Sequence, residues 1–266
     1  MFIPLYDTNR LRHIRLQYVT IGLIVANVLV YFATALGGQN FTNAAVLGLG
    51  FIPSVVHDTA ELDPRFVVIP ESLSYVTYSF LHADIFHLGG NMLFLWVFGD
   101  NVEDALGHIR YLIFYLLSAV AGAAFQGLVA WDSQVPLIGA SGAIAGVVVA
   151  YLILYPRVKV WVLAFARIPL RIPAFIPLLL WVAFQIVMFA AGGEDQISWA
   201  CHIGGIMAGA ILVLVLRSRG VPLFAPADED VVAPAPDQPP LAVEPAAPEP
   251  PANQTRWGRG NPPGAN

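Results

Sequence analysis

Long apolar runs separated by short polar segments occupy the first 216 residues of the chain. Six of these runs contain almost no charged residues, and their lengths approach the roughly 20 residues that a helix needs to span a bilayer. The pattern therefore predicts an all-α fold class, a polytopic bundle of six transmembrane helices. The predicted helices cover residues 17–36, 84–100, 110–130, 140–155, 173–191 and 199–216.

The polar segments divide the chain further. A long loop, residues 37–83, carries four acidic residues together with Pro53, Pro64 and Pro70, whereas 12 of the 21 prolines fall within residues 222–266. A segment so rich in proline, without apolar periodicity, cannot bury enough surface to offset its chain entropy. We therefore expect three parts: a cytoplasmic N-terminal segment (1–16), a membrane domain (17–217) and a disordered, Pro-rich cytoplasmic tail (218–266).

Composition agrees with a membrane protein. Hydrophobic residues make up 57% and charged residues 12% of the chain, whereas soluble domains have roughly 45–50% and about 25%. The first apolar run follows a polar, basic start and is long enough to remain as an anchor, so no cleaved signal peptide is expected. The single cysteine, Cys201, excludes an internal disulfide and a multi-cysteine metal site.

Positive charges predict the orientation of the helices. With six crossings, 12 of the 13 Lys and Arg residues fall on one side, and only Arg65 falls on the other. Because positively charged loops stay in the cytoplasm, both termini are expected there, in an inner (cytoplasmic) membrane. An odd number of crossings would scatter these charges over both sides.

Four polar side chains then fall at a similar depth below the non-cytoplasmic face. His87 and Asn91 lie in the first turns of the second predicted helix, Ser141 begins the fourth and His202 lies near the start of the sixth. Polar groups at such depths are costly and usually face a protein interior or a water-filled cavity. Agreement in depth among three separate segments indicates a site.

The spacing of these residues favours acyl-transfer chemistry. His87 and Asn91 are four residues apart and project from one helix face. Small residues follow at Gly142 and Gly146 after Ser141, and at Gly205 and Gly209 after His202. Such stripes let helices approach closely enough for a serine hydroxyl to reach an imidazole, which is a nucleophile–base pair.

In the same arrangement, His87 and Asn91 would donate hydrogen bonds to an oxyanion. Glu194 and Asp195 lie in the loop before the sixth helix, about two turns from His202 and near water, so we expect a Ser–His dyad and not a triad.

Each of these residues also has a simpler interpretation. Ser141 alone resembles a helix N-cap, His202 a buried interhelical hydrogen-bonding group, and His87 with Asn91 a polar clamp between helices. The joint arrangement favours catalysis over these separate roles. The six histidines are scattered in depth and no H-E-x-x-H pattern occurs, so no metal is expected.

Over residues 17–217 the chain resembles the rhomboid family of intramembrane serine proteases. Four sequence features carry the resemblance: "GASG" with Ser141, His202 with Gly205 three positions on in "WACHIGGIMAG", the H-x-x-x-N pair in "HLGGN", and "GDNVEDALG" with Glu103 as a hydrogen-bonding residue. His82 also falls where many members carry a further histidine.

The resemblance implies an endopeptidase with a Ser141–His202 dyad and an oxyanion hole of His87 and Asn91. It implies a bundle open to water from the non-cytoplasmic side, which cleaves transmembrane segments of single-span or polytopic membrane proteins near that face. No cofactor, metal or nucleic acid is expected.

Two departures from the family pattern stand out. Ala145 replaces a tyrosine that stacks on the histidine in some members, and the segment "ESLSYVTYSF" before the second helix lacks the Trp-Arg pair of many members.

Two other functions remain as alternatives. A non-catalytic rhomboid-like module that binds or escorts membrane proteins would be expected to lack the nucleophile or the base, and both are present here. A small-solute transporter would be expected to show internal repeats or broken helices with matching polar sites, and the sequence shows no such symmetry.

Overall fold

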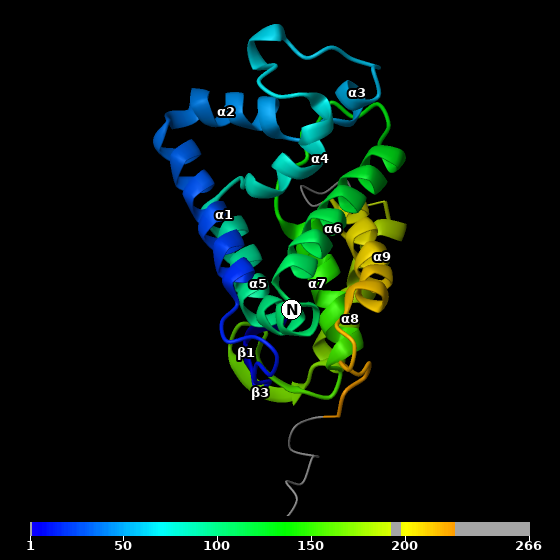
Figure 1. Cartoon of the computed structure of the whole chain (residues 1–266). Coiled ribbons are helices and arrows are strands. Elements are labelled where there is room, and N and C mark those ends of the chain that lie inside the picture. Colours follow the sequence, from blue (N-terminus) through cyan, green and yellow to red (C-terminus); the bar gives the residue numbers. More distant parts are fainter. Residues whose placement is uncertain (1, 193–197, 227–266) are drawn as a thin grey trace, which may run out of the picture. The chain divides into compact units, whose positions relative to one another are not determined.

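All six predicted apolar segments are helical in the structure, a computed structural model that describes residues 2–192 and 198–226 (Figure 1). The described residues belong to one compact unit. Its helices are α1 (Tyr18–Leu36), α2 (Gly38–Leu49), α3 (Pro53–Val56), α4 (Ser74–Thr77), α5 (Ile85–Leu106), α6 (His108–Val129), α7 (Ser141–Leu154), α8 (Phe175–Ala190) and α9 (Trp199–Leu216). Its strands are β1 (Phe2–Asp7), β2 (Lys159–Ala164) and β3 (Ile168–Pro173).

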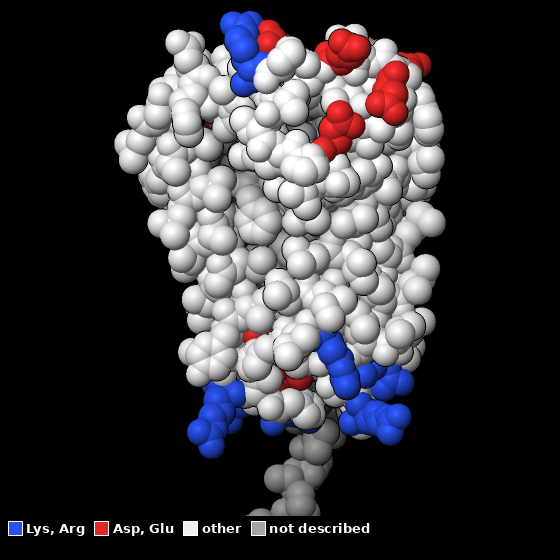
Figure 2. Space-filling model, turned by 45° about the horizontal axis from the view of Figure 1, so that its top comes forward, with Lys and Arg blue, Asp and Glu red and all other residues white. Residues whose placement is uncertain are grey.

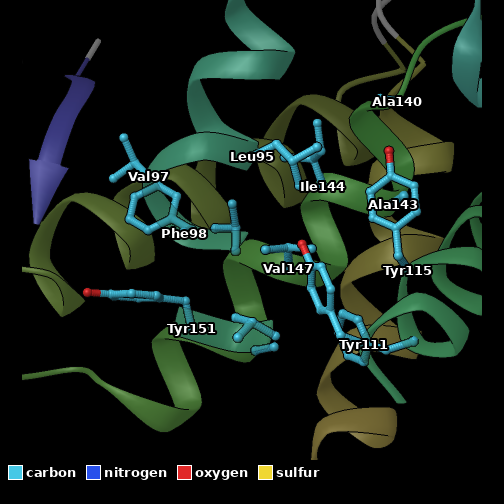
Figure 3. Close-up of a cluster of buried hydrophobic side chains, with 14 of the residues drawn as sticks. Leu95, Val97, Phe98, Tyr111, Tyr115, Ala140, Ala143, Ile144, Val147 and Tyr151 are labelled. Atoms are coloured by element: carbon cyan, nitrogen blue, oxygen red, sulfur yellow. The ribbon is translucent and has the colours of Figure 1, made fainter. Parts of the chain in front are cut away.

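Helix α7 is the centre of the bundle. It packs against α5, α6, α8 and α9, and 11 of its 14 residues are buried. Aromatic and branched side chains of α5, α6 and α7 form the core around it (Figure 3). A helix that is apolar on all sides is typical of such a central position.

Helix α5 continues six residues beyond the predicted end at residue 100 and includes the acidic residues Glu103 and Asp104. The carboxylate of Glu103 is completely buried. It accepts hydrogen bonds from the backbone N–H groups of Val19 (3.0 Å) and Thr20 (2.8 Å), and from the Thr20 hydroxyl (2.7 Å). Because α1 has no side-chain cap of its own, Glu103 satisfies the free N–H groups at its N-terminus.

Asp104, the next residue, holds the segment that precedes α1. Its carboxylate accepts hydrogen bonds from the backbone N–H groups of Arg12, His13 and Ile14 at 2.6–3.1 Å. Two adjacent acids of α5 therefore fix both the start of α1 and the chain leading into it. Because Glu103 and Asp104 interrupt the apolar pattern, the helix end predicted from that pattern was too early.

The all-α prediction missed a three-stranded antiparallel sheet with the order β1-β2-β3. In β2 the residues Val160, Val162 and Ala164 point inward and alternate with partly exposed ones, the period of a half-buried strand. Ile3 of β1 lies opposite Leu163 of β2. The predicted N-terminal segment 1–16 is thus joined to the chain between α7 and α8 by backbone hydrogen bonds.

Charge is distributed unequally between the two ends of this unit. On the face shown in Figure 2, Lys and Arg side chains gather at one end, and most of the visible acidic atoms, with basic atoms beside them, lie at the other. In the loop between α2 and α5, Arg65 forms an ion pair with Asp63 (2.6 Å). Strand β1 and the last described residues both lie at the opposite, basic end (Figure 1).

The length and apolarity of α1, α6 and α9 suit membrane-spanning helices, and α7 and α8 are shorter apolar helices. Residues 218–226 of the predicted tail return to the bundle, where Phe224 and Ala225 donate backbone hydrogen bonds to the carbonyls of Ile153 and Leu154. The remainder of that predicted tail lies outside the described residues.

Replacing Glu103 with alanine should destabilise the protein, because two N–H groups in the first turn of α1 lose a charged acceptor. We expect the free energy of unfolding to fall by about 2–3 kcal/mol, measured by denaturant titration in detergent. Glu103→Gln keeps one acceptor oxygen and should lose less. Glu71→Ala, at an exposed acid, is the matched control, and an equal loss in that variant would contradict the assignment.

Asp7, at the end of β1, gives the fold a pH dependence. Burial raises the pKa of this carboxyl from its ordinary 3.8 to about 7. The hydrogen bond from the Tyr151 hydroxyl lowers the pKa, and the nearby charge of Asp100 raises it. Between these two values the unfolded chain releases the proton that the folded protein retains. The contribution of Asp7 to stability is therefore complete below about pH 4 and is lost as the pH rises towards 7.

Asp7→Asn should therefore be more stable than the parent protein at pH 8, and the difference should shrink between pH 7 and pH 5. Thermal unfolding midpoints in detergent at several pH values measure this. Asp63→Asn provides the contrast, because its hydrogen bonds with Arg65 lower the Asp63 pKa to about 2, so its effect changes only in acid. Parallel curves for Asp7→Asn and the parent would refute the prediction.

Candidate active site

Ser141 and His202 lie in hydrogen-bonding contact although 61 residues separate them. Ser141 is the first residue of α7, and His202 lies in the first turn of α9. The Ser141 Oγ atom is 2.8 Å from His202 Nε2. As the first helical residue, Ser141 also has a backbone N–H without an acceptor inside the helix. The pair therefore has the separation required for proton transfer between a nucleophile and a base.

The glycines of α7 and α9 bring these helices together. A Cβ atom added at Gly205 would overlap the carbonyl oxygen of Gly142, and one added at Gly209 would lie 2.5 Å from Gly146 Cα. The predicted stripes of small residues are thus in direct backbone contact. On the other side of α9, a Cβ atom at Gly204 would lie 2.5 Å from the Ala121 carbonyl oxygen of α6. Two helices therefore fix the position of α9.

His87 and Asn91 lie beside the residues that lead into α7. Gly139 has φ +118°, a conformation that side chains disfavour, and a Cβ atom there would lie 2.7 Å from His87 Nε2 and 3.9 Å from Asn91 Nδ2. Asn91 Nδ2 is buried and has no hydrogen-bond partner among the described residues. An unpaired buried donor is costly, and this one lies near Gly139, two residues before Ser141.

The second ring nitrogen of His202 has a partner that the sequence analysis did not anticipate. His202 Nδ1 is 2.7 Å from Oε1 of Gln185, a buried residue of α8. The rings of Trp181 and Trp199 flank the imidazole at centroid distances of 6.3 and 6.0 Å. Aromatic side chains of α8 and α9 thus neighbour the imidazole, and Ala145 of α7 is buried. Glu194 and Asp195 lie outside the described residues.

Two other residues singled out in the sequence lie nearby. His82 is buried, neither of its ring nitrogens has a hydrogen-bond partner among the described residues, and its ring lies 5.0 Å from that of His87. Cys201 is buried, with its Sγ atom 3.5 Å from the Tyr78 hydroxyl. Within the described ranges, no group of three or more His, Cys, Asp or Glu side chains has the geometry to hold a metal ion.

The segment before α5 is anchored without a Trp-Arg pair. The Tyr78 hydroxyl donates to the Ala119 carbonyl oxygen (2.9 Å), and the Tyr78 carbonyl accepts from the N–H of Gly139 (3.0 Å). The Thr77 hydroxyl donates to the Leu49 carbonyl oxygen (2.6 Å). Tyr78 thus joins the long loop to α6 and to the residues preceding Ser141.

An apolar cavity opens beside His202. It has a volume of about 420 Å³ and is lined by residues of α5, α8, α9, β1 and β2, among them Phe94, Phe98, Trp181, Phe184, Trp199 and His202. Few polar atoms line it: Gln185 and His202 supply the polar side chains among the lining residues. The cavity therefore suits an apolar segment that reaches the imidazole from between α5 and α8.

All four predicted site residues thus meet at one place, and Gln185 is a neighbour that was missed. The available signal was a single glutamine within the apolar run 173–191. Its importance depends on which face of α8 meets α9, and the sequence pattern does not define that rotation.

Comparison with known proteins gives matches to one family. A family model described as "Rhomboid domain" matches residues 70–219, more than half of the chain. Rhomboid protein 1, mitochondrial, of Saccharomyces cerevisiae is 30% identical over 184 residues, covering 64% of this chain and 49% of that protein.

Two further relatives are similar at lower identity. RHOMBOID-like protein 12, mitochondrial, of Arabidopsis thaliana is 26% identical over 73% of this chain and 56% of its own length. The human Presenilin-associated rhomboid-like protein, mitochondrial, is 26% identical over 73% of this chain and 47% of its own length. The chain thus spans about half the length of these curated relatives.

Gly205→Ala should separate α7 from α9, because its methyl group would overlap the Gly142 carbonyl. Overpacking of this kind costs about 1–3 kcal/mol, which a lower unfolding midpoint in detergent would report. Gly22→Ala in α1 adds the same methyl group where nothing lies within 4 Å, and it should leave stability unchanged or slightly raised. Equal midpoints for the two variants would show that the close contact does not constrain the bundle.

Proposed function

Because the chain belongs to the rhomboid family and is a multi-pass integral membrane protein, we propose that it is an intramembrane serine endopeptidase. The observation that carries the proposal is the 2.8 Å contact between Ser141 Oγ and His202 Nε2. A serine is a weak nucleophile unless an adjacent base removes its proton, and this contact supplies that base.

In the proposed reaction, Ser141 Oγ bonds to the scissile carbonyl carbon while its proton moves to His202 Nε2. The carbonyl oxygen becomes an oxyanion, which His87, the Asn91 amide and the backbone N–H of Ser141 stabilise. As the C–N bond breaks, His202 gives the proton to the leaving amine. The acyl group stays on Ser141 Oγ as an ester. The same imidazole then takes a proton from a water molecule as the water oxygen bonds to the ester carbon, and it returns that proton to Ser141 Oγ as the ester C–O bond breaks and the new carboxyl group leaves.

The proposed substrates are transmembrane segments of single-span or polytopic membrane proteins, cut near the outer membrane face. The apolar cavity between α5 and α8 supports sideways access from lipid, because it leads to His202 and its lining is almost entirely apolar. A helix conceals its peptide bonds in its own hydrogen bonds. Segments with helix-destabilising residues near that face should therefore be preferred.

We further propose that α1, α5, α6, α7, α8 and α9 form six membrane crossings. An even number of crossings is supported because β1 and the last described residues lie at the same end of the unit (Figure 1). Basic residues at that end favour a cytoplasmic location for both termini, in an inner (cytoplasmic) membrane (Figure 2). The mitochondrial location in the relatives' names describes those proteins.

Ser141→Ala and His202→Ala should each abolish cleavage of a single-span membrane substrate by the purified protein in detergent. Loss of nucleophile or base lowers kcat by about 10⁴-fold or more in comparable enzymes. Asn91→Ala should lower kcat by about 10²–10³-fold, because an oxyanion donor is lost. A fluorophosphonate reagent should label the parent protein and not Ser141→Ala.

Ser118→Ala is the matched control, because this buried serine of α6 lies beside Gly146 and outside the proposed dyad. It should retain both labelling and cleavage. Cleavage by Ser141→Ala would overturn the proposal. An uncleaved substrate that still copurifies with the parent protein would instead support the alternative, a non-catalytic membrane-protein binding module.

A further inference from the structure

Gln185 is the one polar side chain among the three buried residues of α8, the others being Pro177 and Leu178. Only 3% of its surface is exposed. Most of α8 otherwise presents apolar side chains outward. A buried amide in a lipid-facing helix is costly unless its hydrogen bonds are made, and so the contacts of this side chain need an explanation.

The two ends of the Gln185 amide have distinct partners. Its Nε2 donates to the carbonyl oxygen of Trp181, one turn earlier in α8 (3.4 Å), and its Oε1 lies 2.7 Å from His202 Nδ1. Because the amide nitrogen is directed at a carbonyl, the oxygen must face the imidazole. An amide oxygen only accepts hydrogen bonds, and so Nδ1 must carry a proton in this contact.

This contact selects the chemically useful form of the base. A neutral imidazole carries one proton, and if that proton is on Nδ1, Nε2 has a free lone pair directed at Ser141 Oγ, 2.8 Å away. In the opposite tautomer Nε2 is protonated, and the lone pair of Nδ1 faces the Gln185 oxygen. Only the first form can accept the serine proton.

We propose that Gln185 is a positioning residue that holds His202 in the Nδ1–H tautomer and fixes the orientation of its ring. The effect of Gln185 on catalysis rests on the proposed function. The effect of Gln185 on the tautomer and orientation of the His202 ring does not. The role is one that an aspartate fills in many serine hydrolases. A neutral amide fills it here without placing a charge beside the apolar cavity.

Several groups surround the imidazole. Trp181 and Trp199 flank it, and His87, with His82 behind it, is the neighbouring titratable group among the described residues. No carboxylate of the described chain is hydrogen-bonded to His202. The amide of Gln185 is therefore the acceptor that orients Nδ1.

Three variants test the proposal in the full-length protein. Gln185→Met keeps the length of the side chain and removes the acceptor, so kcat for a single-span substrate should fall about 10- to 100-fold, as expected for a lost buried hydrogen bond, with KM little changed. Gln185→Glu restores an acceptor oxygen and should recover activity at neutral pH. Gln126→Met is the matched control, because Gln126 is hydrogen-bonded to Ser198 before α9, whereas the ring nitrogens of His202 are hydrogen-bonded to Gln185 and Ser141.

The pH profile of kcat separates positioning from mere packing. A carboxylate in Gln185→Glu favours the protonated imidazole, which cannot accept the serine proton, so the acidic limb of the profile should move to higher pH. Gln126→Met should leave that limb in place. A loss that is equal in Gln185→Met and Gln126→Met, with an unmoved limb in Gln185→Glu, would overturn the proposal.

A second measurement does not depend on cleavage. In protein labelled with ¹⁵N-histidine, the ring-nitrogen NMR shifts of His202, assigned with His202→Asn, should report the Nδ1–H tautomer in the parent and a mixture in Gln185→Met. Unchanged tautomer populations would refute the role of Gln185 even in a protein with no protease activity. If Gln185→Met fails to fold, Gln185→Glu supplies both readouts. In that variant the acidic limb of the kcat profile and the ring-nitrogen NMR shifts of His202 must both change. An inactive parent that retains the tautomer effect would refute the proposed function alone.

Discussion

The near-contact of the α7 and α9 backbones is the constraint on which the rest of the site depends. Gly142 and Gly146 of one helix meet Gly205 and Gly209 of the other at distances that leave no room for a Cβ atom. In a bilayer, apolar side chains gain little by leaving lipid, and helices associate mainly through such close packing. The separation of Ser141 from His202 is therefore set by two helix axes, and it does not depend on a loop.

The remaining elements differ in how firmly they hold this pair. Glu103 and Asp104 tie α5 to α1 and to the segment before it, and the sheet ties the N-terminal residues to the chain after α7. Helix α8, in contrast, buries only three residues. The site is thus built between a firmly packed core and a lightly packed helix, and Gln185 is the polar link between them.

The sequence was sufficient for the helices and for the four residues that meet at the site, because long apolar runs and depth are local properties of the chain. It did not reveal the sheet, since pairing of residues 2–7 with 159–164 is a contact between distant segments. The extension of α5 was missed because the burial of Glu103 depends on N–H groups of another helix. Gln185 was missed for a similar reason: its partner is defined only after α8 is rotated and docked.

The shortness of α7 has a consequence for hydration. Fourteen residues extend about 21 Å along a helix, whereas the hydrocarbon core of a bilayer is about 30 Å thick. In the proposed six-crossing topology a helix of this length does not span the hydrocarbon core, and so Ser141 at its start lies below the membrane surface, where water for the proposed hydrolysis is scarce. The ring nitrogens of His82 and Nδ2 of Asn91 are buried without a hydrogen-bond partner among the described residues, and such groups are typical binding positions for a buried water molecule. Under the proposed function, the bundle must therefore supply two reactants by different routes, a peptide from the lipid and water from outside the membrane.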